Sequence, residues 1–168
     1  MRGKWAQGIV PRNFRWILKD HLAVCERPGG YGDNHRRVRR QEEIIWIREN
    51  GFSRIVSLIG APKNLHNYDE LGMPWIHRPL PEGTDMGGDL VDHYTEVADL
   101  LSQGEKLLLH HEELGDRMAG YVAGYLVWKG LMPAPPEAIT VVEQMFERQL
   151  GPGARQVVAL AAALTADG

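Results

Sequence analysis

Short apolar runs alternate along this chain with longer segments in which apolar residues recur every three or four positions. The short runs indicate buried strands because they are rich in β-branched residues and too short for helices, whereas the longer spacing is typical of one helical face. The predicted strands are 54–59, 75–80 and 106–110, preceded by two short strands or a hairpin within 14–24. The predicted helices are 34–50, 64–71, 90–102, 117–131 and 137–150.

Glycine and proline mark the boundaries of these elements. Gly51, Gly72 and Gly104 each follow a predicted helix, where glycine often ends one. Residues 81–89, Pro-Glu-Gly-Thr-Asp-Met-Gly-Gly-Asp, predict a loop because they concentrate turn-forming residues. The expected organisation is an N-terminal arm at 1–13, one domain at 14–153 and a C-terminal tail or short helix at 154–168.

The alternation of strands and helices is typical of an α/β fold, in which helices cover the faces of a sheet. Ligands bind to such sheets beyond the carboxyl ends of the strands, where loops lead into helices. The loop between strand 106–110 and helix 117–131 is therefore the first place to look for a functional site.

That loop has the make-up of an anion site. The strand ends in His110, His111 follows, and Arg117 opens the next helix after five intervening residues. A phosphate is held well by the N–H groups of a short loop, the positive end of a helix and a bidentate arginine. The predicted phosphate-binding loop consists of His111, Glu112, Glu113, Leu114, Gly115, Asp116 and Arg117.

This arrangement resembles the signature loop of the cysteine-dependent dual-specificity and tyrosine-type phosphatases, which runs strand, His-Cys, five residues, Arg, helix. The following run, Ala-Gly-Tyr-Val-Ala-Gly-Tyr-Leu at 119–126, is similar to that family's buried helix. Earlier landmarks of the family are matched by Leu22-Ala23, Arg27-Pro28, 51–58 and 72–75, so that the resemblance spans about residues 20–150. It implies a three-layer fold with a central, mostly parallel sheet of four or five strands flanked by helices.

The departures from the family pattern concern the chemistry. His111 stands where the family keeps its nucleophilic cysteine, Leu114 where a loop glycine is usual, and Met118 where a Ser or Thr normally follows the arginine. The thiolate mechanism needs a low-pKa sulfur beside the arginine and a helix N-terminus. The chain has one cysteine, Cys25, and the resemblance places it far from the loop. The standard mechanism is therefore excluded.

Two functions remain open. The first is a pseudophosphatase that recognises a phosphorylated or anionic ligand, or a protein partner, without turnover. The second is an active hydrolase on a phosphorylated small molecule or a phosphoprotein, in which His111 acts with Arg117 and an acidic residue. An imidazole supports the second function because it can accept a phosphoryl group or transfer a proton near neutral pH.

Two carboxylates are the main candidates for the acid, and Glu82 and Asp89 of the turn-rich loop are less well placed. Asp116 directly precedes Arg117 and resembles the acid in the Lys-Asp-Arg variant of certain bacterial phosphatases, although Gly115 replaces the lysine. Asp85 belongs to the preceding turn-rich loop, where the family more often places its acid.

The loop also carries charge that opposes anion binding. Glu112, Glu113 and Asp116 place three carboxylates in it, and any two that pointed inward would offset Arg117 and the helix dipole. His110 and His111 are adjacent on a strand and so point to opposite faces, which makes a shared metal ion unfavourable, and no metal site is expected.

Composition narrows the expected partners. The formal net charge of −3 gives no electrostatic case for nucleic acid. No apolar run approaches the roughly 20 residues of a membrane span, and the first residues lack the apolar core of a signal peptide. We therefore expect a cytoplasmic protein that binds a phosphorylated or anionic small molecule or a phosphoprotein, with no membrane association and no cofactor.

One basic cluster stands apart from the loop. It consists of Arg36, Arg37, Arg39 and Arg40. It is either a solvated helix start balanced by Glu42 and Glu43 or a second patch for phosphate groups or a nucleic-acid backbone.

Overall fold

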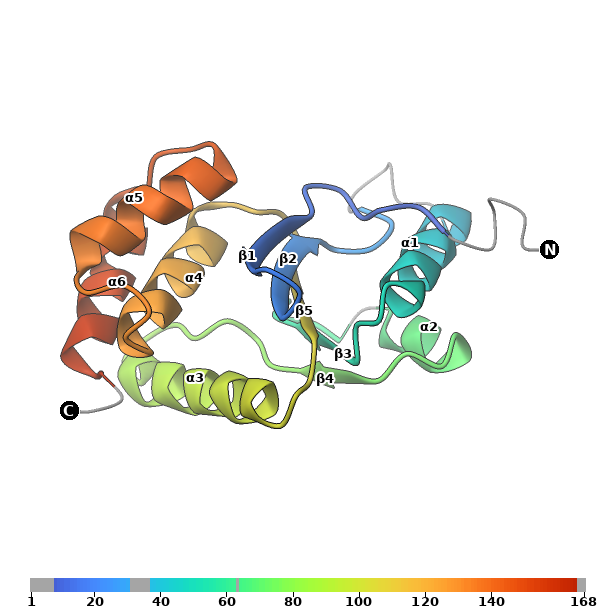
Figure 1. The fold of residues 1–168 in the computed structure, drawn as a ribbon, viewed down its shortest axis with the longest axis horizontal. Helices are drawn as coiled ribbons and strands as arrows, with labels where there is room; N and C mark the ends of the chain where they lie inside the picture. Colours follow the sequence, from blue (N-terminus) through green and yellow to red (C-terminus); the bar gives the residue numbers. More distant parts are fainter. Residues whose placement is uncertain (1–7, 31–36, 63, 166–168) are drawn as a thin grey trace. The chain divides into compact units, whose positions relative to one another are not determined.

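Five short strands form one sheet in the order β1-β2-β5-β3-β4 (Figure 1). Their bounds are β1 Arg15–Leu18, β2 Leu22–Glu26, β3 Arg54–Ser57, β4 Trp75–His77 and β5 Leu107–His111. β1 and β2 form an antiparallel hairpin, whereas β2, β5, β3 and β4 pair in parallel. A hairpin, one of the two alternatives for residues 14–24, is present, and the predicted mostly parallel α/β sheet is confirmed.

Six helices accompany the sheet in the computed structural model, which describes residues 8–30, 37–62 and 64–165. They are α1 Arg37–Glu49, α2 Leu65–Glu70, α3 Met86–Ser102, α4 Asp116–Trp128, α5 Pro135–Phe146 and α6 Pro152–Ala163. All five predicted helices are present, and α6 is the short helix expected as one alternative for the C-terminal segment. Parts of two predictions lie outside the described residues: residues 1–7 of the predicted arm and residues 34–36 of the predicted helix 34–50, which include Arg36 of the basic cluster.

The chain divides into two compact units, each built from two separate stretches of sequence. The sheet unit comprises Met1–Pro79 and Gly104–Glu113, and therefore holds all five strands with α1 and α2. The helical unit comprises Leu80–Gln103 and Leu114–Gly168, and holds α3 to α6. The chain passes from the sheet unit to the helical unit within the predicted phosphate-binding loop.

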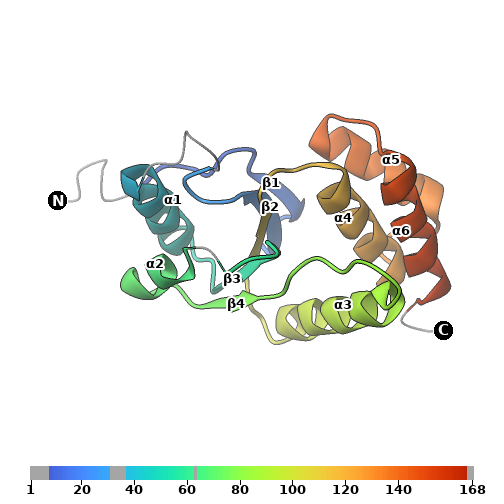
Figure 2. The same cartoon turned by 180° about the vertical axis from the view of Figure 1, so that it is seen from behind.

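The core of the sheet unit lies between one face of the sheet and the helices α1 and α2, which lie side by side in Figures 1 and 2. Apolar side chains of the strands alternate onto this face because successive strand residues point to opposite sides. The buried cluster consists of Ala23, Cys25, Ile44, Ile47, Phe52, Ile55, Leu65, Tyr68, Met73 and Leu108.

His110 is the polar member of this core. Its side chain is buried, and its Nε2 atom lies 2.8 Å from the hydroxyl of Tyr68. Burial first, and then the positive charges of Arg27, His111 and His77, lower the pKa of His110 to about 3. The imidazole is therefore neutral at physiological pH and serves as a hydrogen-bonding element of the core.

Close helix packing defines the helical unit. A Cβ atom at Gly120 of α4 would lie 2.8 Å from the Cα atom of Ala154 in α6, and one at Gly124 would lie 2.5 Å from the hydroxyl oxygen of Tyr94. That hydroxyl donates a 2.8 Å hydrogen bond to the carbonyl of Tyr121. The two glycines of the Ala-Gly-Tyr-Val-Ala-Gly-Tyr-Leu run therefore allow α4 to approach its neighbours closely.

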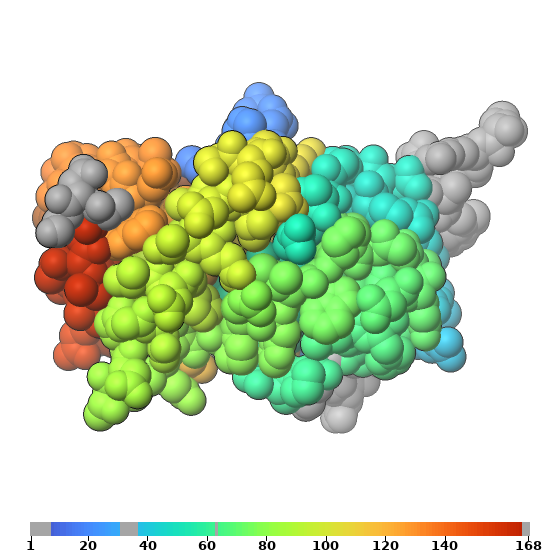
Figure 3. Space-filling view, turned by 90° about the horizontal axis from the view of Figure 1, so that it is seen from below, coloured from blue at the N-terminus to red at the C-terminus, as the bar shows by residue number. Residues whose placement is uncertain are grey.

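The prediction of a loop throughout 81–89 is wrong at its end, because α3 begins at Met86. Gly87 lies in the first turn of this helix, where a Cβ atom would stand 3.4 Å from a methyl group of Leu164, at the end of α6, and 3.9 Å from one of Leu160. Packing against α6 thus overrides the low helix propensity of the glycine pair. The outer surface of α3 is seen in yellow-green in Figure 3, and its exposed residues include Asp92 and Asp99.

Within the described ranges, none of the helices combines the length and the apolar character that a membrane-spanning helix needs. The expectation of a cytoplasmic location stays a prediction.

Replacing Gly120 with alanine should destabilise the protein by about 1–3 kcal/mol, because the added methyl group has no space against α6. Gly88 is the matched control, since nothing lies within 4 Å of a Cβ atom there. Gly88→Ala should be neutral or stabilising by up to about 1 kcal/mol through helix propensity. Urea unfolding of both variants measures the difference, and equal stability of the two would contradict this account of the α4–α6 contact.

His110 should make stability depend on pH. Its pKa is about 3 in the folded chain and near 6.5 when unfolded, so between these values only the unfolded chain binds the proton. Stability should therefore fall as pH falls from about 6.5 towards 3, and His110 should account for up to about 2 kcal/mol between pH 7 and pH 5. Urea unfolding of wild type and His110→Gln at both pH values isolates this contribution. An identical pH dependence in the two proteins would rule out the assignment.

Candidate functional site

The predicted phosphate-binding loop joins β5 to α4 and belongs to both units. His111, Glu112 and Glu113 complete the sheet unit, whereas the helical unit resumes at Leu114 and includes Arg117. Each half of the loop is held by contacts within its own unit.

Arg27 fixes the first half of the loop. Its backbone N–H donates a 2.9 Å hydrogen bond to the carbonyl of His111, the last residue of β5. Its buried guanidinium donates to the carbonyl of Gly30 at 3.1 Å and forms an ion pair with Glu112 at 3.3 Å. Glu112 is therefore engaged by a cation of the sheet unit.

His110 and His111 point to opposite faces of the sheet. His110 lies on the face that contacts Tyr68 of α2, and strand alternation directs the half-buried His111 side chain to the other face. This alternation is the reason why the two imidazoles were not expected to share a metal ion. Within the described residues, no group of three or more His, Cys, Asp or Glu side chains is placed to hold a metal ion.

Cys25 is closer to the loop than expected. The resemblance implied a distant cysteine, but Cys25 of β2 is the register partner of His110 in β5. Its side chain is nevertheless buried in the core under α1 and α2. Burial first, then the negative charges of Glu43 and Glu26, raise the pKa of this thiol. Cys25 is therefore a protonated core residue. The prediction that it lies far from the loop is wrong, because β2 pairs directly with β5.

Arg117 lies in the first turn of α4 and has an exposed side chain. Its guanidinium stands 3.6 Å from the carboxylate of Glu82, with 54% of the arginine and 81% of the glutamate side chain exposed. Solvent screens such a pair, so its contribution to stability is small. Arg117 is therefore available to an anionic ligand that can offer two oxygens.

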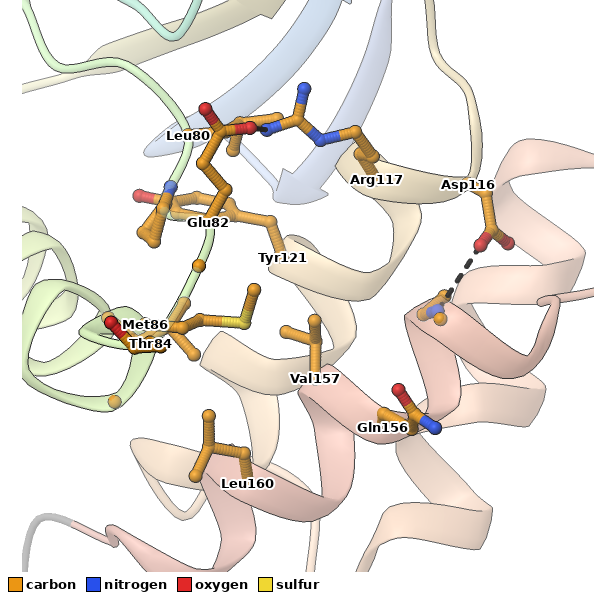
Figure 4. A pocket seen from close by; sticks show the side chains of 16 residues that line it. Leu80, Glu82, Thr84, Met86, Asp116, Arg117, Tyr121, Gln156, Val157 and Leu160 are labelled. Atoms are coloured by element: carbon orange, nitrogen blue, oxygen red, sulfur yellow. Dashed lines mark hydrogen bonds and ion pairs between the residues drawn. The ribbon is translucent and has the colours of Figure 1, made fainter.

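Asp116 faces the start of α6. Its carboxylate accepts hydrogen bonds from the backbone N–H groups of Gly151 at 2.7 Å and Ala154 at 3.2 Å, and Figure 4 draws the second as a dashed line from Asp116. These donors belong to the residue before α6 and to its first turn, so Asp116 caps that helix from another part of the chain. Asp116 and Arg117, both predicted as site residues, thus have different partners: Asp116 bonds the start of α6, whereas Arg117 pairs with Glu82.

Asp85 occupies the N-cap position of α3 and is exposed, and its side chain makes no capping hydrogen bond. It stands between Thr84 and Met86, both of which line a cavity of the helical unit. Of the two candidate acids, Asp85 is the one whose carboxylate forms no helix cap.

A cavity of about 620 Å³ lies in the helical unit beside Arg117. It is enclosed by the segment before α3 and the start of that helix, by α4 and by α6. Two of the predicted site residues, Asp116 and Arg117, line it; the walls also contain Leu80, Glu82, Met86, Leu90, Tyr121, Val157 and Leu160. Sequence reasoning missed the α6 residues. Val157 and Leu160 are three positions apart, which indicates an apolar helical face, but this spacing does not show that the face lines a cavity.

Solved structures provide the comparison with known proteins. Kinase associated phosphatase, solved with its catalytic-site cysteine replaced by serine, has a TM-score of 0.75 at 18% identity, covering 94% of this chain and 98% of that one. Tk-PTP in its active form gives a TM-score of 0.68 at 17% identity, with coverage of 90% and 97%. Human DUSP28 gives 0.64 at 13% identity, with coverage of 93% and 97%.

No known family profile matches the sequence, and no curated protein matches it. The structural neighbours are phosphatases of low identity, so the likeness concerns the fold. The likeness nevertheless extends over 90–94% of this chain. This protein has the α/β fold of the dual-specificity and tyrosine-type phosphatases.

Proposed function

We propose that this protein is a pseudophosphatase: its loop at 111–117 recognises a phosphorylated or anionic ligand, a small molecule or a phosphoprotein, and does not hydrolyse it through a thiolate. A loop that leads from the carboxyl end of the parallel strand β5 into α4 supports this proposal, because ligands of α/β sheets bind at such loops. The function of that loop then depends on which residues it supplies.

The observation that carries the proposal is the state of the cysteine. Kinase associated phosphatase has a cysteine in its catalytic site. This chain has one cysteine, Cys25, which is buried in the core with a raised thiol pKa. A nucleophilic thiolate needs the opposite environment, exposed and electropositive. His111, the last residue of β5, stands where the resemblance places the nucleophile.

The second half of the loop supports anion recognition. Arg117 lies in the first turn of the 13-residue helix α4, where the helix dipole also favours negative charge. Its ion pair with exposed Glu82 is long and screened, so a phosphate can displace the carboxylate at small cost. Glu112 and Asp116 are engaged by Arg27 and by the start of α6. Glu112 and Asp116 therefore have partners other than Arg117.

The alternative is an active hydrolase in which His111 acts with Arg117 and an acid. The capping role of Asp116 favours Asp85 as that acid, because a proton donor must be free to approach the leaving group. Phosphate binding is common to both functions, whereas turnover belongs to the hydrolase alone.

Inorganic phosphate and vanadate should bind at millimolar concentration or tighter in calorimetry at pH 7. Arg117→Lys should weaken binding about tenfold, because lysine cannot form the two parallel hydrogen bonds of the guanidinium. Glu82→Gln should strengthen binding by up to about fivefold, since it removes the competing carboxylate. Glu137→Gln in α5 makes the same change in net charge and is the control. Binding that is indifferent to Arg117 and Glu82 would contradict the proposed site.

Hydrolysis of an aryl phosphate should be negligible in the wild-type protein, because that reaction relies on a strong nucleophile in the loop. His111→Ala and Cys25→Ala should leave the rate at the background value, measured as phenolate release under substrate excess. Robust activity that is lost in His111→Ala and kept in Cys25→Ala would replace the pseudophosphatase by the hydrolase.

A further inference from the structure

We propose that the cavity beside Arg117 binds the aliphatic part of an amphipathic anion, a small molecule with a phosphate head and an alkyl body. The inference rests on the proposed function, because Arg117 is the cation in both. It adds the chemical class of the ligand, which the loop alone does not specify.

The size and walls of the cavity suit an apolar ligand body. A volume of about 620 Å³ is within the usual range of about 300–1,000 Å³ for small-molecule sites. In Figure 4 the side chains of Met86, Val157 and Leu160 converge from α3 and α6 on the part of the cavity away from Arg117. Leu90 and Tyr121 add apolar wall from α3 and α4. Filling this space with alkyl groups would remove these side chains from water.

Charge gathers at the other end of the cavity. Arg117 and Glu82 lie together there in Figure 4, apart from Val157 and Leu160. Asp116 also lines the cavity, but its carboxylate accepts the N–H groups of Gly151 and Ala154. The cation that a ligand can reach is therefore at one end.

This separation of charge and apolar surface determines the polarity of the ligand. A purely apolar molecule would leave the guanidinium of Arg117 without a new partner, and a bare phosphate would leave the α3–α6 walls in water. An alkyl phosphate satisfies both ends, since its head takes two guanidinium hydrogen bonds and its chain covers the apolar walls. Glu82 is the group that the head displaces, and its 81% exposure lets it move into solvent.

Two contacts with α4 fix the position of α6 within the helical unit. The Asp116 cap fixes the start of α6. The backbone of α6 also lies so close to α4 that a Cβ atom at Gly120 would stand 2.8 Å from the Cα atom of Ala154. Val157 and Leu160 are on the same helix. The apolar wall that Val157 and Leu160 form is therefore in place before a ligand binds, so that less conformational entropy of the protein is lost on binding.

Calorimetry of the full-length protein with inorganic phosphate, butyl phosphate and hexyl phosphate tests the inference. Affinity should rise about fourfold for each added methylene, or about fifteenfold from butyl to hexyl. Val157→Gln and Leu160→Gln should abolish most of this rise and leave the affinity for inorganic phosphate unchanged. Ala159→Gln is the matched control, because Ala159 is an exposed residue of α6 outside the cavity. It should behave as wild type.

The outcomes separate this inference from the proposed function. If inorganic phosphate binds through Arg117 but hexyl phosphate binds no tighter, the cavity inference is overturned and the anion site stands. If hexyl phosphate binds as well in Arg117→Gln, or hexanol binds as tightly as hexyl phosphate, the head contributes nothing and the inference is also overturned. If Val157→Gln and Ala159→Gln weaken hexyl phosphate equally, the chain does not occupy the proposed walls.

Discussion

The carboxylate of Asp116 accepts hydrogen bonds from the backbone N–H groups of Gly151 and Ala154, which lie 35 and 38 residues further along the chain. Unpaired N–H groups at a helix start need an acceptor, and here the acceptor is the first residue of α4. One interaction thus joins the end of the β5–α4 loop to the C-terminal helix. Arg117 is the next residue of α4, and Val157 and Leu160 lie on the helix whose start Asp116 caps.

Glu112 and Asp116 of the loop are likewise held by partners within their own unit. Three carboxylates precede one arginine in the loop sequence, an arrangement that would oppose anion binding if the carboxylates faced the arginine. Glu112 instead pairs with the buried Arg27, and Asp116 is held by backbone donors. Arg117 is left facing exposed Glu82 at 3.6 Å. An anion site can coexist with a negative loop because each of these two carboxylates has a partner in its own unit.

The two histidines illustrate how a strand separates structure from chemistry. Neighbouring residues of β5 face opposite sides of the sheet, so His110 enters the core and bonds Tyr68, whereas His111 lies on the other face. Cys25 shares the core face and its apolar surroundings, and the pKa of its thiol is raised for that reason.

The sequence by itself determined the α/β class, the hairpin, the strand before the loop and the helix after it, because hydrophobic spacing and glycine positions are local properties of the chain. It also identified the continuous motif from His111 to Arg117, whose two ends lie in β5 and in the first turn of α4, since a continuous motif needs no tertiary information. The start of α3 at Met86, the capping role of Asp116 and the nearness of Cys25 to His110 were decided only by tertiary structure. Each depends on contacts between residues far apart in sequence, and neither local propensity nor spacing encodes such contacts. The cavity walls on α6 belong to the same group, because an apolar face on a helix does not specify what it will enclose.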